Sequence, residues 1–266
     1  MAESKVLSTI TDISKAVTYI TPLPYVSGNI REYDIKAANI NILLQKNVIN
    51  QAQYDYLNNL PKVYREIDVG NMERRDIAVY NTISDGIREA KFKLLSENDV
   101  NPFSVVRVAN DAIYINSSVE LSKLQFDKVT FVKKKEFNVM VNLNGVLVFI
   151  SLFGENYDVE VIGINDNLLF AHEKFIGFIC DLVYRIERVG YKDAVEFYQD
   201  FYDKYINHKL DLEYYREFNT NSCYTTMGAL KFGLWSIDSL DNIDTGYNLY
   251  LLRQLWIILL QMAKLK

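Results

Sequence analysis

The spacing of apolar residues changes twice along the chain, and this change restricts the fold more than any single motif does. From residue 104 to about residue 163 the period of apolar residues shifts towards two, as in VVRVAN, AIYIN, KVTFVKK and FNVMVNL, and the apolar run GVLVFISLF follows as a further probable strand. Alternation at every second residue is typical of half-buried β-strands. The LNG sequence at 143–145 is a turn signal between two of them. Strands that follow one another through short turns predict an antiparallel meander.

Helical spacing dominates on both sides of this strand segment. Upstream, Val6, Ile10, Ile13 and Val17 predict an amphipathic helix over residues 4–20. We further expect a loop over 21–29, a strand over 30–35, and helices over 36–47, 50–60, 73–97, 168–190, 193–206 and 245–266. The fold class is therefore α+β, with N-terminal helices, an antiparallel sheet and a C-terminal all-α part. We predict two domains, a mixed one over residues 1–165 and a helical one over residues 166–266.

Composition excludes several kinds of site. The chain has two histidines and two widely separated cysteines, Cys180 and Cys223, so neither a disulfide framework nor a zinc site is expected. A formal net charge of −5 disfavours non-specific binding of nucleic acid by the chain as a whole. The longest apolar run, LWIILL at 255–260, is too short to span a bilayer, and the N-terminus lacks the apolar core of a signal peptide. We therefore expect a cytoplasmic protein without a membrane partner.

Residue usage indicates a source for the chain. Tyr, Asn, Ile, Lys and Asp recur throughout, and 19 of the 266 residues are tyrosine. Such usage is typical of AT-rich genomes, including those of bacteriophages and low-GC bacteria. We expect a phage protein, which would act in the host cytoplasm.

Two aspartates stand where strands end. Asp34 follows a short strand and precedes a helix in REYDIKAANINILL, and Asp111 lies at the tip of the hairpin VVRVANDAIYI. If the sheet brings these carboxylates together, they can hold Mg²⁺, which prefers oxygen ligands and binds through one or two carboxylates plus substrate phosphates. The sequence thus predicts Asp34 and Asp111 as metal ligands.

The same segments resemble the palm domain of viral family B DNA polymerases. YDIKAANI (33–40) looks like the first palm motif, an aspartate after a strand followed by a turn and a helix. VVRVANDAIYI (105–115) is similar to the third motif, an acidic hairpin, and the strands that follow resemble the lysine-containing strands of that palm. The resemblance covers about residues 30–165 and implies a palm-like sheet, a helical thumb and a nucleotide or nucleic-acid ligand.

The chain departs from the family pattern at several positions. Asn110-Asp111 stands where the third motif usually has two aspartates, and Asn39 falls near the place of the tyrosine that gates the sugar. The second motif is not recognisable. The resemblance therefore implies a reduced palm, and whether it catalyses is left open; an active form would be a metal-dependent nucleotidyltransferase.

Basic residues supply candidate phosphate contacts. A helix over 73–97 occupies the place of the family's nucleotide-binding helix, and a run of three lysines follows in the strand region. The candidates for binding nucleotide or phosphate are Arg74, Arg75, Arg88, Lys91, Lys133, Lys134 and Lys135.

A second hypothesis needs no site at all. Asn and Asp are common turn residues, and Asp34 also suits the cap of the following helix. The segment EYYREFNTNSCYTT (213–226) combines Tyr and Arg, which are enriched at protein interfaces. The alternative is a non-enzymatic viral accessory or structural protein that acts through contacts with other viral proteins.

Overall fold

The computed structural model describes residues 7–118, 120–143, 145–164, 169, 172–215 and 246–263. The chain divides into two compact units, each with its own hydrophobic core. Unit 1 comprises Met1–Pro22 and Gly28–Glu136, and unit 2 comprises Leu23–Ser27 and Phe137–Lys266. Two long strands, β2 (Tyr25–Ile35) and β6 (Val129–Leu143), contribute residues to both units. The boundary predicted near residue 165 lies within unit 2.

Unit 1 is built on an antiparallel sheet with the strand order β1-β3-β4-β2-β6. Strands β3 and β4 form the predicted hairpin, and β4 pairs with β2 so that Asp34 lies opposite Ala112. The strands of this unit besides β2 and β6 are β1 (Tyr19–Ile20), β3 (Val105–Val108), β4 (Ala112–Asn116) and β5 (Gln125–Phe126), which pairs with β6. Burial of β4 from Ala112 to Ile115 places this hairpin in the core.

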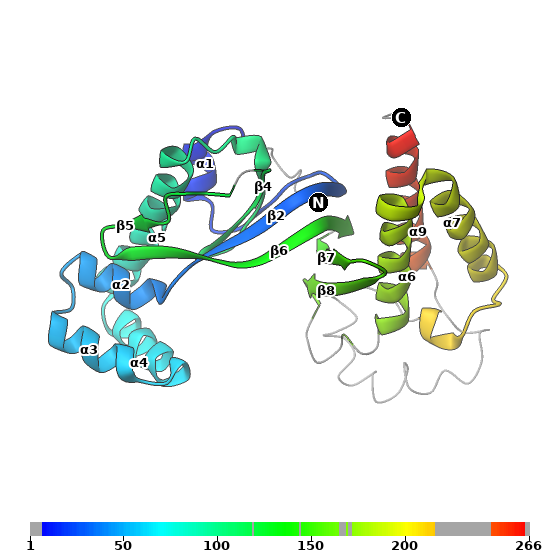
Figure 1. Cartoon of the computed structure of the whole chain (residues 1–266). Coiled ribbons are helices and arrows are strands. Elements are labelled where there is room, and N and C mark those ends of the chain that lie inside the picture. The colour runs from blue at the N-terminus through cyan, green and yellow to red at the C-terminus, as the bar shows by residue number, and fades with distance from the viewer. Residues whose placement is uncertain are drawn as a thin grey trace. The chain divides into compact units, whose positions relative to one another are not determined.

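Three helices of unit 1, α1 (Ile10–Lys15), α2 (Ala38–Gln45) and α4 (Lys62–Arg75), pack against its longest helix, α5 (Ile77–Glu97) (Figure 1). Ile83, Ile87 and Leu94 are buried and form one face of α5. Gly86 allows a close approach to α2, because a Cβ atom there would meet Ile42 Cγ2 at 2.3 Å. The remaining helical elements of unit 1 are α3 (Gln51–Asn59), which contacts α2 and α4, and the 3₁₀ turn η1 (Pro102–Ser104).

Unit 2 combines the remaining residues of β2 and β6 with two further strands and a helical part. Its strand order is β2-β6-β7-β8, with β7 at Val146–Phe153 and β8 at Asn156–Ile162. Helices α6, α7 and α9 lie side by side (Figure 1) and bury many aromatic rings. The helical elements are α6 (Glu173–Tyr184), the π-helical turn η3 (Arg185–Val189), α7 (Tyr191–Ile206), η4 (Leu212–Tyr215) and α9 (Gly246–Ala263).

The structure confirms the α+β class, with N-terminal helices, an antiparallel sheet and C-terminal helices. Among the described residues, no helix is both long enough and apolar enough to cross a membrane. Most of the segment 213–226 lies outside the described residues, as does Cys223.

Several predicted elements are wrong in their extent. The N-terminal helix ends at Lys15, and Tyr19–Ile20 pair with β3 as an edge strand instead of completing a further helical turn. Part of the predicted loop over 21–29 belongs to β2, which starts at Tyr25. The predicted strands KVTFVKK and FNVMVNL form one continuous strand, β6, because no turn residue separates them.

Helix α4 was not predicted at all. It contains Gly70 and Asn71, which favour helices poorly. Its only buried residue is Val69, while Val63, Tyr64 and Ile67 are exposed. Because most of its apolar side chains face solvent, α4 lacks the amphipathic pattern from which helices are predicted.

Candidate functional site

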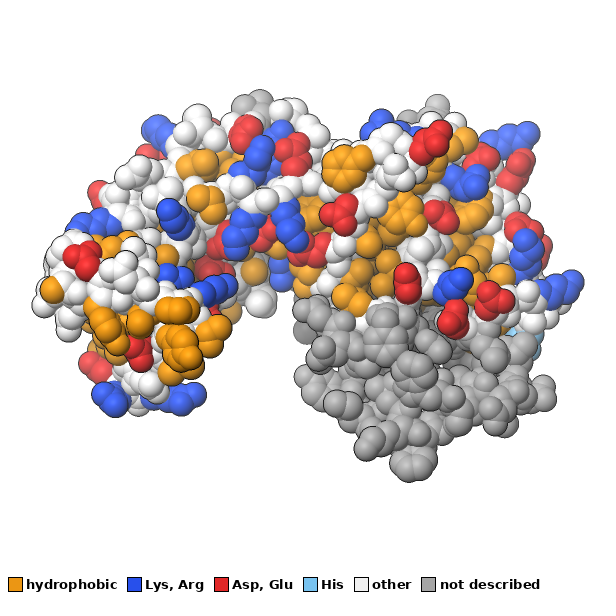
Figure 2. Space-filling view, turned by 60° about the horizontal axis from the view of Figure 1, so that its bottom comes forward, with side chains coloured by type: hydrophobic (Ala, Val, Ile, Leu, Met, Phe, Trp, Pro, Cys, Tyr) orange, Lys and Arg blue, Asp and Glu red, His pale blue; other side chains and the backbone are white. Residues whose placement is uncertain are grey.

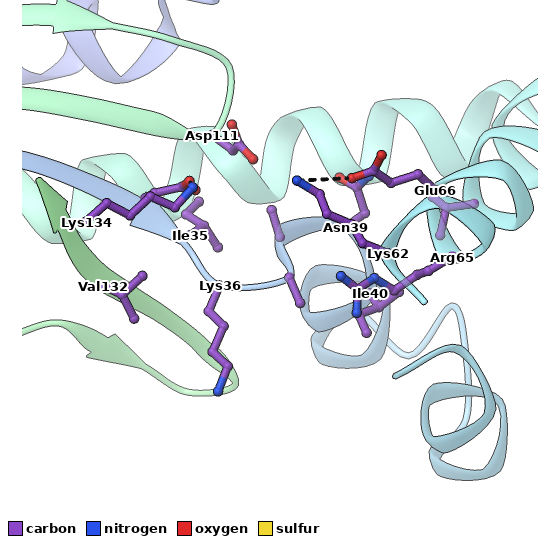
Figure 3. A pocket seen from close by; sticks show the side chains of 14 residues that line it. Ile35, Lys36, Asn39, Ile40, Lys62, Arg65, Glu66, Asp111, Val132 and Lys134 are labelled. Atoms are coloured by element: carbon purple, nitrogen blue, oxygen red, sulfur yellow. Dashed lines mark ion pairs between the residues drawn. The ribbon is translucent and has the colours of Figure 1, made fainter. Parts of the chain in front are cut away.

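A pocket of about 290 Å³ in unit 1 brings together the ends of two strands, the start of α2 and one face of α4. Both predicted metal ligands, Asp34 and Asp111, line it. Figure 3 shows Asp111, Lys134, Lys62, Arg65 and Glu66 around this pocket, with Lys36 pointing away from Asp111. The pocket therefore combines carboxylates with cations, so it can contact both a metal ion and an anion.

Asp34 is held at the end of β2 by the turn that follows it. Lys36 N–H donates to the Thr130 carbonyl on β6 at 2.9 Å, and Asn41 Nδ2 donates to the Lys36 carbonyl at 2.6 Å. Ala37 has φ 46° and ψ 50°, a left-handed conformation that costs a non-glycine residue about 1 kcal/mol. These contacts hold a strained turn between strand and helix, and they direct the chain into α2.

Asp111 occupies one of the two tip positions of the β3–β4 hairpin. The Ala109 N–H donates to the Ala112 carbonyl at 2.9 Å and leaves Asn110 and Asp111 as the turn. The Asp111 carbonyl accepts from Ile35 N–H at 3.1 Å, which ties this tip to the residue after Asp34. The aspartate is thus both a turn residue and a lining residue of the pocket, so the two interpretations of Asn110-Asp111 are compatible.

Lys134 on β6 forms an ion pair with Asp34. The Asp34 side chain is 11% exposed, whereas that of Lys134 is 50% exposed. Within the described residues, the Asp34 carboxylate makes this ion pair and no hydrogen bond to the amides of α2. The alternative prediction that Asp34 caps this helix is therefore wrong, and its charge is balanced by a lysine.

Helix α4 supplies two further cations to the pocket. Lys62 lies 3.6 Å from Glu66 in an exposed i,i+4 ion pair. The Arg65 side chain lines the pocket, and among the described residues it has no ion pair. A guanidinium that is not paired with a carboxylate has its five N–H donors available to an anion.

Lys91 is buried in unit 1 and is not a lining residue of the pocket. Its side chain is 1% exposed, and its ammonium donates to the Ala16 carbonyl at 2.8 Å. Burial and, to a smaller extent, the charge of Arg88 lower the pKa of Lys91 from 10.5 to about 8, while the charge of Asp111 acts in the opposite direction. Lys91 thus places a buried positive charge near Asp111.

The other predicted phosphate contacts lie elsewhere in unit 1. Arg74 and Arg75 are exposed in the last turn of α4, and Arg88 pairs with Asp85 at 3.0 Å. Lys133 pairs with Glu120 at 3.0 Å and Glu136 at 3.4 Å, and Lys135 is exposed. Of the predicted set of seven, Lys134 alone is a lining residue of this pocket.

The donor atoms of the pocket fit a divalent cation that arrives with a ligand. The described residues contain no cluster of three or more His, Cys, Asp and Glu side chains. Asp34 and Asp111 supply carboxylate oxygens, which are the hard ligands that Mg²⁺ prefers. Two carboxylates leave most of the coordination shell to water and phosphate oxygens, as in many Mg²⁺–nucleotide sites.

Lys62 and Arg65 are lining residues that the sequence analysis missed. They lie three residues apart at the start of a helix, so they share one face. Pro61 immediately before Lys62 is a helix-start signal that could have revealed this arrangement. Asn39, noted near the position of a family tyrosine, also lines the pocket.

Comparison with known proteins gives one result about kinship. A search among proteins with curated descriptions finds no match to this chain. A family model described as "Bacteriophage PBS1 gene 130 protein" matches residues 13–263, which is nearly the whole chain. The match includes both units, so it does not depend on the pocket alone. The chain belongs to the bacteriophage PBS1 gene 130 protein family and is a phage protein.

Proposed function

We propose that the unit 1 pocket binds a nucleotide, either free or at the end of a nucleic-acid strand, together with a divalent cation. The observation that carries this proposal is that two aspartates remote in sequence, Asp34 and Asp111, line one pocket with Lys62, Arg65 and Lys134. Carboxylates alone would suit a cation, and cations alone would suit an anion. A metal–phosphate ligand uses both.

Each lining residue has a role in this proposal. Asp34 and Asp111 would hold the cation, which would bridge the protein to the phosphate oxygens. Lys62 and Arg65 approach from α4 and would bind the phosphates, Arg65 through two parallel hydrogen bonds. Asn39 lies at the start of α2, where its amide could contact the sugar or base.

The proposal keeps the resemblance to a reduced palm of viral family B DNA polymerases. Two divalent ions can align an attacking hydroxyl and a leaving pyrophosphate. The chain offers Asp34 and Asp111 for such chemistry, with Asn110 at the position of a second hairpin acid. Nucleotide binding is the part of the palm function that these residues support best. In this proposal the protein acts in the host cytoplasm and binds nucleotides there.

Binding of Mn²⁺ and a nucleoside triphosphate, measured by calorimetry on the full chain, tests the proposal. Arg65→Gln should weaken triphosphate binding about 10-fold or more, since a hydrogen bond to a charged group contributes about 1.5–3 kcal/mol. Arg74→Gln is the matched control, because Arg74 is exposed on the same helix and lies outside the pocket. Equal effects of the two variants, or no binding by the unmodified chain, would overturn the proposal.

Variants of the two aspartates distinguish the contribution of the metal ion to binding from that of the phosphate contacts. Asp34→Asn and Asp111→Asn should each remove the dependence of triphosphate binding on Mn²⁺ while the melting temperature without ligand stays nearly unchanged. Asp99→Asn is the control: Asp99 is exposed outside this pocket at φ 50°, a conformation that Asn also adopts. A metal dependence that survives both pocket variants would assign the cation elsewhere.

Replacing Lys134 should strengthen metal binding, whereas replacing the other pocket residues should weaken ligand binding. Its ammonium now balances Asp34, so a divalent cation must displace it. Lys134→Gln should therefore tighten binding of Mn²⁺ alone about 3- to 10-fold and weaken binding of the triphosphate, which loses a cation. Looser binding of both ligands would assign Lys134 a structural role.

A contact with another protein is the second candidate function. Tyr56, Val63, Tyr64 and Ile67 on α3 and α4 are exposed, with exposed fractions of 53–65%. Figure 2 shows hydrophobic side chains gathered at this end of unit 1. Aromatic and aliphatic side chains that gather on a surface are typical of interaction sites.

The simplest partner to test is a second copy of this chain. Sedimentation analysis of the unmodified chain and of a Tyr64→Ser, Ile67→Ser double variant measures self-association. A dimer that dissociates in the variant supports this second function. A monomer at all concentrations, with nucleotide binding intact, leaves the first proposal alone.

A further inference from the structure

Unit 2 contains a separate pocket of about 420 Å³ between α7 and α9. Its α7 residues are two adjacent pairs that lie four residues apart, and its α9 residues are three apart, so each set lies on one side of its helix. The lining residues are Tyr198, Gln199, Tyr202, Asp203, Arg253 and Trp256. This volume is in the range of pockets that hold small ligands.

Three aromatic rings form a stack along this pocket. The Tyr198 ring centre lies 5.4 Å from that of Trp256 at an interplanar angle of 27°, and 6.0 Å from that of Tyr202 at 18°. These are offset-stacked arrangements. Near-parallel rings offer their faces to another flat ring, whereas a cage for a quaternary ammonium group surrounds the cation with rings at steep angles. The stack therefore favours a planar ligand.

The middle ring of the stack is fixed in place. Tyr198 is 4% exposed, and its hydroxyl donates to the Leu252 carbonyl on α9 at 2.7 Å. The ring of Phe178 lies 6.5 Å from it on the core side. A surface that is ordered before the ligand arrives lowers the entropic cost of binding.

Polar groups surround the stacked rings. Gln199 offers an amide, Asp203 a carboxylate and Arg253 a guanidinium. In the part of the chain that the structure describes, none of these three side chains has a hydrogen bond or an ion pair. Together they provide donors and acceptors, which match the edge of a nitrogen-containing ring better than that of a hydrocarbon ring.

The charges at this pocket balance one another. The neighbouring acids of α7 are already paired, Asp200 with Lys204, Glu196 with Lys192 and Asp193 with Arg185. This leaves Asp203 and Arg253, one of each sign, at the pocket. A ligand without net charge is therefore favoured over a polyphosphate.

We propose that the pocket between α7 and α9 binds a single nucleobase by stacking on the partly exposed rings of Tyr202 and Trp256, which the buried Tyr198 ring holds in place. The base belongs either to a free nucleoside or to a single-stranded nucleic acid, in which stacking on aromatic side chains is a general mode of binding. The inference is independent of the unit 1 pocket, because a nucleoside carries neither the phosphates nor the metal that the unit 1 proposal requires.

Fluorescence of Trp256 reports directly on this pocket. The chain has two tryptophans, Trp235 and Trp256, so a Trp235→Phe background leaves one reporter in the pocket. Adenosine should quench its fluorescence in a saturable way at concentrations up to about 10 mM, which corresponds to weak single-base binding. Absence of saturable quenching overturns the proposal.

Ring and edge variants in the same background locate the binding. Tyr202→Leu keeps an apolar side chain and removes the flat ring, so adenosine affinity should fall about 5- to 100-fold. Tyr250→Leu is the matched control, because Tyr250 is an exposed tyrosine of α9 that does not line the pocket. Arg253→Gln and Asp203→Asn should change the preference between adenosine and cytidine. If the control loses as much affinity as Tyr202→Leu, the pocket is not the site.

A short oligoadenylate distinguishes the two sources of the base. Binding at least about tenfold tighter than adenosine, at equal concentration of bases, identifies single-stranded nucleic acid as the ligand. Equal affinity identifies the free nucleoside. Loss of both ligands in Tyr202→Leu supports the proposal, and binding of the oligonucleotide that Tyr202→Leu leaves unchanged contradicts it.

Discussion

The two pockets of this protein are built from opposite kinds of side chain. In unit 1, Asp34, Asp111, Lys134 and Arg65 gather where strands end and a helix begins. In unit 2, Tyr198, Tyr202 and Trp256 stack between two helices over an aromatic core. The polar side chains at the strand ends of unit 1 lie outside its hydrophobic core. The aromatic rings between the two helices of unit 2 pack directly against its core. Changes near the second pocket should therefore cost more stability than changes at the first.

The largest expected difference in stability comes from substituting an aromatic residue of the core beside the unit 2 pocket. Phe178 is 3% exposed and packs against Phe175, Phe197, Tyr198 and Phe201. Phe178→Ala should lower the free energy of unfolding by about 3–5 kcal/mol, through lost burial and a cavity. Arg65→Gln at the unit 1 pocket should change it by less than about 0.5 kcal/mol. Urea denaturation measures both, and similar losses would refute the distinction.

The pH dependence of stability contrasts a buried lysine, whose pKa is lowered, with tyrosines whose pKa is raised. The unfolded chain keeps the Lys91 proton up to about pH 10.5, while burial brings the folded pKa to about 8. Between these values the unfolded state binds more protons, so stability rises with pH, by about 1–3 kcal/mol. Burial has the opposite effect on tyrosines and raises the pKa of Tyr157 to about 12. The unfolded tyrosines therefore ionise first above about pH 10, and stability falls there.

Lys91→Met isolates the lysine contribution. The rise in unfolding free energy between pH 8 and about pH 10 should disappear in this variant, while the fall above about pH 10 should remain. Denaturation curves at several pH values provide the measurement. A rise of equal size in Lys91→Met would assign it to another group.

Salt should affect the two pockets differently. Raising the salt concentration from about 0.05 M to about 0.5 M should weaken triphosphate binding at unit 1 about 3- to 10-fold, because the attraction between exposed charges is screened. Adenosine binding at unit 2 should change less than about twofold, since stacking involves no net charge. Titrations at the two salt concentrations compare them directly. Equal salt dependence would mean that both ligands bind at one kind of site.

The smallest expected effect concerns an aromatic residue that does not belong to a core. Tyr64 on α4 is 62% exposed, in contrast to Tyr198 on α7, which is 4% exposed. Tyr64→Ser should change the free energy of unfolding by less than about 0.5 kcal/mol, as is usual for surface positions. A larger loss in denaturation experiments would mean that Tyr64 packs on a partner, such as a second copy of the chain.

The local residue pattern was sufficient for much of the fold. Alternation in VVRVAN and AIYIN, with Asn110-Asp111 between them, predicted the β3–β4 hairpin correctly. Helical spacing predicted α5, α6, α7 and α9 to within a few residues at most ends. The prediction missed α4. Most apolar residues of this helix are exposed, so they form no amphipathic pattern in the sequence.

The residues of the candidate site were found partly from the sequence and partly from the tertiary structure. Strand-end position alone marked Asp34 and Asp111, because charged residues beside buried strands stand out in a sequence. Lys62 and Arg65 are ordinary surface cations in the sequence, and only the packing of α4 brings them to the same pocket. Likewise, the sequence does not distinguish Lys91 from Lys134. In the structure, Lys91 is buried and donates to the Ala16 carbonyl, whereas Lys134 forms an ion pair with Asp34.

The sequence by itself determined the α+β class, the hairpin and the two aspartates, since these follow from periodicity and from turn chemistry between neighbouring residues. Tertiary structure alone decided which cations join Asp34 and Asp111, and that Tyr198, Tyr202 and Trp256 form one stack. The physical reason is that side-chain partners are chosen by contacts between residues far apart in the chain, and no local pattern encodes those contacts.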